Sequence, residues 1–93
     1  MKVVDKTGTF AGDKDAAALI RDEYLRPRLD SGKRAVLDFS RVDLATQSFI
    51  HALVASVIRE IPDSLNRIAF KNCNANVQSI IEIVVEYAQD DFD

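Results

Sequence analysis

A buried strand followed directly by an amphipathic helix is the feature that most restricts the fold of this chain. Residues 34–39 (RAVLDF) form a short apolar-rich run, and residues 47–61 (QSFIHALVASVIREI) follow after the polar turn SRVDLAT. Apolar side chains in the second run recur with the period of an α-helix. They are Ile50, Leu53, Val54, Val57, Ile58 and Ile61. The two runs therefore predict a strand and a helix that packs this stripe into a core.

The same alternation of strand and helix runs through the rest of the chain. Further strands are expected at residues 1–4 and 67–72, and further helices at residues 14–25 and 77–89. The order β-α-β-α-β-α predicts an α/β fold with a largely parallel or mixed sheet and helices mainly on one face, because each helix serves as a crossover between strands. Residues 7–10 could add a fourth strand at the sheet edge.

Three residues mark helix ends. Asp13 suits the N-cap of the first helix, because its carboxylate can accept hydrogen bonds from the free N–H groups of the first turn. Proline has no N–H and clashes with the preceding turn, so Pro27 is expected to end or kink the first helix and Pro62 to stop the second.

The last helix has more apolar surface than one buried face requires. The stripe expected to be buried consists of Val77, Ile81, Val84 and Ala88. Ile83 and Tyr87 point well away from that stripe. These two side chains are either additional core residues or an interface, and such an interface could pair two copies into a homodimer.

Size and composition indicate one small domain, residues 1–93, of the ordinary globular type. The formal net charge of -3 argues against nucleic acid as a partner. No apolar run approaches the roughly 18 residues of a membrane span, so no membrane association is expected. Cys73 is the single cysteine and His51 the single histidine, which leaves no internal disulfide and no metal site. A reducing cytoplasm is the expected location.

No catalytic motif is recognisable, so neither an enzymatic activity nor a cofactor is expected. The chain has no Walker loop, no glycine-rich dinucleotide turn and no nucleophile–base pair. Residues 7–12 (TGTFAG) precede a helix and could hold a phosphate, which keeps a small phosphate- or nucleotide-binding protein as an alternative. His51 is interpreted as a half-buried packing residue and Cys73 as a structural residue.

Residues 36–53 (VLDFSRVDLATQSFIHAL) carry a more specific pattern. A strand ends in Asp-hydrophobic-Ser, a valine follows, and a serine stands at the start of the next helix. These residues are Asp38, Phe39, Ser40, Val42 and Ser48, followed by Leu53. The pattern resembles the STAS family, the domain of bacterial anti-sigma factor antagonists. Residues 8–11 (GTFA) and 46–49 (TQSF) are similar to segments of a STAS-like family of small bacterial proteins of uncharacterised function.

The resemblance implies a function for Ser48. In the antagonists, the serine at the helix start is phosphorylated by a partner kinase that is also the anti-sigma factor. The resemblance therefore implies that a histidine-kinase-like ATPase docks near Ser48 and that phosphorylation of Ser48 switches the contact. The antagonists' loop reads Asp-Ser-Ser-Gly, whereas residues 46–49 read Thr-Gln-Ser-Phe. Docking and phosphorylation are thus separate expectations for this chain.

Helix geometry independently supports the interpretation of Ser48 as part of a partner-binding face. With Ile50 at the centre of the buried stripe, residues on the opposite side would be small or polar and would let another surface come close. A phosphate in the first turn would be favoured by free N–H groups and by the helix dipole. The expected partner-binding residues are Asp38, Ser40, Thr46, Gln47, Ser48, Ala52, Ala55 and Arg59. A capping role in a turn is the competing interpretation of Asp38, and a self-associating structural protein is the competing function.

Overall fold

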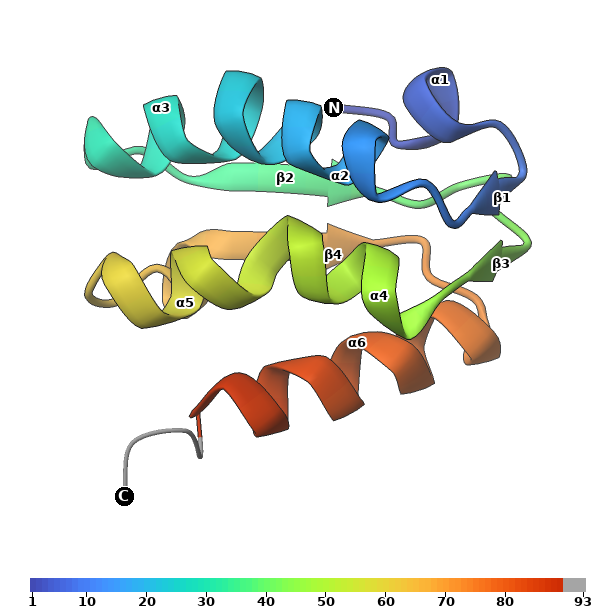
Figure 1. The fold of residues 1–93 in the computed structure, drawn as a ribbon. Helices are drawn as coiled ribbons and strands as arrows, with labels where there is room; N and C mark the ends of the chain where they lie inside the picture. Colours follow the sequence, from blue (N-terminus) through green and yellow to red (C-terminus); the bar gives the residue numbers. More distant parts are fainter. Residues whose placement is uncertain (90–93) are drawn as a thin grey trace.

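The computed structural model describes residues 1–89 and shows short parallel strands beside three long helical segments (Figure 1). In chain order the elements are α1 (Val4–Thr7), β1 (Phe10–Ala11), α2 (Lys14–Ile20), the π turn η1 (Arg21–Leu25), α3 (Arg26–Asp30), β2 (Ala35–Asp38), β3 (Leu44–Ala45), α4 (Gln47–Ile50), the π turn η2 (His51–Ala55), α5 (Ser56–Glu60), the 3-10 turn η3 (Leu65–Arg67), β4 (Ile68–Lys71) and α6 (Ala75–Gln89). The predicted α/β class is confirmed.

The strands form two small parallel sheets. β2 pairs with β4 in the register Ala35↔Ile68 to Asp38↔Lys71. β1 pairs with β3, with Phe10 beside Leu44. Parallel pairing follows from the intervening helices, because a strand that returns through a helical crossover enters the sheet in the same direction.

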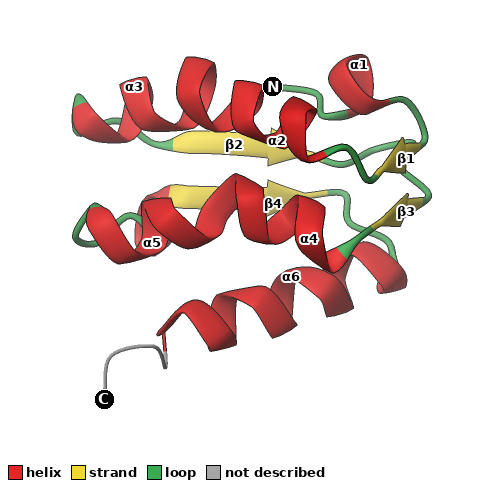
Figure 2. Cartoon of the chain, viewed as in Figure 1, coloured by secondary structure: helices red, strands yellow, loops and turns green. Residues whose placement is uncertain are grey.

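The three helical segments lie side by side and pack their apolar stripes into a single core (Figure 2). The middle segment, from α4 through η2 to α5, contacts α2 on one side and α6 on the other. Burial alternates along β2, where Ala35 and Leu37 are buried and Val36 and Asp38 are half-buried. β2 therefore turns one apolar face toward the core, as expected for a strand that is covered by helices.

Residues 1–4 form an isolated bridge rather than the predicted four-residue strand. Lys2 forms an isolated parallel bridge to Asp38, and the amide of Val3 donates to the Asp38 carbonyl at 2.9 Å. The chain then turns into α1, where the Thr7 amide donates to the Val3 carbonyl at 3.1 Å. The additional strand lies at Phe10–Ala11 rather than at residues 7–10, and it belongs to the second sheet.

The two proline predictions have different outcomes. Pro62 lies just beyond α5, which ends at Glu60 as expected. Pro27 does not end its helix, which continues through α3 to Asp30. Immediately before Pro27 the helix widens into η1, where the Arg26 amide donates to the Arg21 carbonyl. This wider turn lies where the proline interrupts the usual hydrogen bonding, so the helix changes its hydrogen-bonding pattern there and continues.

Candidate functional site

Ser48 lies in the first turn of the middle helix with its side chain exposed. Thr46 is the N-cap, and its Oγ1 accepts a hydrogen bond from the Phe49 amide at 3.1 Å. The Ser48 hydroxyl lies 3.3 Å from Thr46 Oγ1. The next two side chains, Phe49 and Ile50, are fully buried. Because these two apolar residues anchor the turn in the core, Ser48 must face outward.

A shallow groove of about 650 Å³ opens beside Ser48. It lies where the starts of α2 and α4 meet the second half of α6, and the lining is mainly apolar. The residues that line it are Lys14, Gln47, Ser48, His51, Ala52, Val84 and Tyr87. Among residues 1–89, no carboxylate lines this groove. It can therefore accept an apolar side chain, with one cationic residue and one histidine at its rim.

Two asparagines at the start of α6 hold the loop that leads into Ser48. The Asn74 side-chain amide donates to the carbonyls of Val42 at 3.3 Å and Asp43 at 2.9 Å. Its oxygen accepts from the Val77 amide at 2.9 Å, which caps α6. The Asn76 oxygen accepts from the Ala45 amide at 3.2 Å. The loop before Ser48 is thereby fixed to the helix that forms the far wall of the groove.

A family model described as STAS-like domain of unknown function (DUF4325) matches residues 16–78. The chain belongs to this family. The match begins in α2 and ends in the first turn of α6, so it includes Ser48 and the whole middle helix. The predicted resemblance to STAS-like proteins is thus confirmed. Neither the curated proteins nor the solved structures contain a match to this chain.

The STAS-like domain brings some of the predicted site residues together. Gln47, Ser48 and Ala52 line the groove, and Thr46 caps the same turn. Arg59 is exposed but lines a separate hollow of about 410 Å³ near Ser64. The predicted set therefore does not form one continuous surface.

Asp38 and Ser40 lie at the carboxyl end of β2 and do not line the groove. The Asp38 carboxylate accepts hydrogen bonds from the Ser40 amide at 2.9 Å and from Asn72 Nδ2 at 3.0 Å. These bonds, with the bond from Asn72 contributing most, lower the pKa of Asp38 to about 2. The geometry matches the competing interpretation of Asp38 as a capping residue, which here ties the ends of β2 and β4 together.

The predicted exposure of Ala55 is wrong. Its side chain is 1% exposed and packs into the interior. Regular α-helical spacing would put Ala55 two turns from Ser48 on the same side. The π turn η2 intervenes, and its wider i→i+5 hydrogen bonding shifts the following residues around the helix axis.

Sequence reasoning missed most of the groove. Lys14 and Val84 were not assigned to a site, and His51 is exposed at the rim rather than half-buried in packing. Tyr87 is 62% exposed and Ile83 is 49% exposed, so neither is a core residue. The extra apolar residues on the last helix were the one sign of this groove in the sequence. The spacing of residues could not show that the starts of α2 and α4 form its other walls.

The single cysteine has little reactive character. Cys73 is half-buried, and burial, followed by the negative charge of Asp38, raises the pKa of its thiol.

No helix within residues 1–89 combines the length and apolarity needed to cross a membrane.

The Asp38 cap predicts a pH-dependent stability. Asp38→Asn keeps the side-chain shape but removes the charge, so we expect a lower Tm than wild type near neutral pH. The folded pKa of about 2 lies below the ordinary 3.8, so the stabilisation is present above pH 3.8 and is lost as the pH falls through 2. Thermal unfolding of both proteins from pH 7 to pH 2 should show the Tm difference shrinking over this range. A difference that stays constant down to pH 2 would contradict a role for the carboxylate charge.

Proposed function

We propose that this STAS-like domain is a non-catalytic regulatory module that docks a protein partner over the groove beside Ser48. The observation that carries the proposal is the exposed Ser48 hydroxyl beside a mainly apolar groove. Tyr87 and Ala52 offer apolar contact area from different helices, and an exposed apolar patch with a polar rim often marks a protein-interaction site. The partner that the STAS resemblance suggests is a histidine-kinase-like ATPase.

Phosphorylation of Ser48 would change this surface electrostatically. A phosphate adds a charge of about -1.5 to -2. It would stand among Lys14, His51 and the Thr46 hydroxyl, in a groove lined by no carboxylate within residues 1–89. A partner fitted to the groove with an unmodified Ser48 would then have to desolvate a phosphate, which opposes binding. Ser48 modification is therefore the proposed off-switch for docking.

A charge at Ser48 should weaken binding, whereas loss of the hydroxyl alone should not. We expect Ser48→Glu to raise the Kd for a purified kinase-like ATPase by about tenfold or more, which corresponds to about 1.4 kcal/mol. Ser48→Ala should bind nearly as the wild type does. Isothermal titration of the wild type and both variants measures this, and mass spectrometry after incubation with ATP detects a phosphate on Ser48.

Ser79→Glu is the matched control, because Ser79 is exposed on α6 and does not line the groove. It adds the same charge elsewhere on the domain. If the wild type, Ser48→Glu and Ser79→Glu bind the ATPase with equal affinity, the proposed docking face is incorrect.

Self-association is the second candidate, and the exposed Ile83 and Tyr87 on α6 favour it. The charges on the same helix oppose it, however. Glu82 and Glu86 are exposed beside these apolar residues, and α6 carries no basic residue. Pairing α6 with its own copy would bring these carboxylates together, whereas a partner with basic side chains would complement them. Light scattering distinguishes the two functions, because only self-association doubles the mass in the absence of another protein.

A further inference from the structure

Two π turns face each other where the first and middle helices pack. η1 covers Arg21–Leu25 and η2 covers His51–Ala55, and the two turns are in contact. π turns are rare and occur mostly as single turns inserted into α-helices, frequently at functional sites. The second turn begins three residues after Ser48 and contains Ala52 of the groove wall. Its conformation therefore sets where Ala52 stands in the groove wall.

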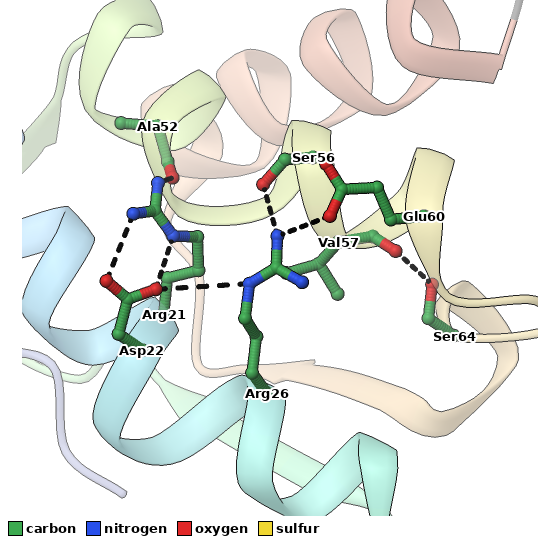
Figure 3. Close-up of polar contacts among 8 residues, drawn as sticks. All are labelled: Arg21, Asp22, Arg26, Ala52, Ser56, Val57, Glu60 and Ser64. Atoms are coloured by element: carbon green, nitrogen blue, oxygen red, sulfur yellow. Dashed lines mark hydrogen bonds and ion pairs between the residues drawn. The ribbon is translucent and has the colours of Figure 1, made fainter.

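Arg21 reaches across the helix interface to the backbone of η2. Its Nη1 donates to the Ala52 carbonyl at 3.1 Å (Figure 3). Asp22 orients the guanidinium through bonds of 2.8 Å from Nε and 3.2 Å from Nη2. The Arg21 side chain is 25% exposed, so this charge-assisted bond is partly shielded from water.

Arg26 belongs to the same network but contacts the helix beyond the π turn. It donates to the Ser56 hydroxyl at 3.0 Å and to the Glu60 carboxylate at 2.9 Å (Figure 3). Both acceptors are side chains, and both lie in α5. Arg21 is therefore the residue of this network that bonds to a backbone carbonyl inside η2.

We propose that Arg21 is a positioning residue that holds the middle helix in its π-turn register. Its guanidinium supplies the Ala52 carbonyl with a donor from outside the helix, which offsets the poorer hydrogen bonding of the widened turn. Ala55 is buried in this register, and Ala52 forms part of the groove wall beside Ser48. Without the bond from Arg21, the turn relaxes toward α spacing and rotates Ala55 toward the Ser48 side. The use of this surface for docking rests on the proposed function. The role of Arg21 in holding the π-turn register does not depend on that function.

Thiol labelling of Ala55→Cys in a Cys73→Ser background tests the register without any partner. Arg21→Met keeps the aliphatic stem but has no donor, so we expect it to speed labelling of the cysteine at position 55 by about tenfold, as local opening does. Arg21→Lys retains a cationic donor and should largely restore protection. Arg26→Met removes the neighbouring guanidinium and should leave labelling close to that of the parent protein.

Ala35→Cys in the same background separates register change from global unfolding. Ala35 is fully buried in β2 and belongs to neither π turn, so labelling there reports opening of the whole fold. Equal acceleration at positions 35 and 55 in Arg21→Met would overturn the proposal, as would equal effects of Arg21→Met and Arg26→Met at position 55. Amide exchange at Ala55 and Ser56 in Arg21→Met without added cysteines gives a second measurement, and unchanged protection there would also overturn it. Loss of ATPase binding with an intact register would instead count against the proposed function.

Discussion

Replacing Phe49 with alanine should lower the free energy of unfolding by about 3–5 kcal/mol, the usual cost of deleting a buried phenylalanine ring. Phe49 is a fully buried core residue in the first turn of the middle helix, and its amide donates to the N-cap Thr46. Native domains have a total stability of about 5–15 kcal/mol, so the variant should lose a large part of its stability and unfold at a clearly lower urea concentration than the wild type. Urea denaturation followed by circular dichroism measures the change.

Phe10→Ala is the matched control, because it deletes the same ring from a side chain that is 56% exposed. Its cost should be about 1 kcal/mol, since less than half of the Phe10 surface leaves water on folding. Equal destabilisation by the two variants would contradict the assignment of Phe49 as the anchor of this turn. The comparison also bears on the site, because Phe49 follows Ser48 directly and its loss would disturb the groove without removing any groove residue.

Elements set by local repetition of apolar residues could be predicted from the sequence. The stripe of the last helix, Val77, Ile81, Val84 and Ala88, is buried as expected. Asp13 caps its helix, accepting from the Asp15 amide at 2.9 Å. Spacing and capping act within a few residues, so a single sequence contains the information that determines them.

Features created by tertiary contacts could not be predicted in this way. Ala55 is buried because of a π turn whose Ala52 carbonyl bonds to Arg21 on another helix. The groove joins Lys14 to Tyr87, which stand at opposite ends of the chain. Residues 1–4 read as a strand because they are apolar-rich, but the hydrogen bonds of Thr7 turn the chain into α1. In the first and third cases a specific hydrogen bond overrides the local preference, and in the second the fold brings together residues that are far apart in the sequence.

Asn74→Ala should destabilise the domain by about 2 kcal/mol, because it removes a helix cap worth about 1 kcal/mol and two further bonds to carbonyls of a partly exposed loop. Those bonds run from Asn74 to Val42 and Asp43, in the loop that leads to Ser48. We therefore expect a local effect beyond the loss of stability: faster amide exchange at Ala45 and Thr46, measured by nuclear magnetic resonance under conditions where the variant remains folded.

Asn66→Ala supplies the comparison, because Asn66 is exposed and bonds only to the nearby Asp63 side chain among residues 1–89. Its cost should lie within about 0.5 kcal/mol of zero, as for most surface substitutions. If Asn74→Ala were equally mild and left the exchange of Ala45 unchanged, α6 would not be what fixes the loop before Ser48. If the expected difference is found, the bonds from Asn74 hold the loop and the start of the middle helix in a fixed position against α6. In that case Asn74 would couple the groove beside Ser48 to the start of α6.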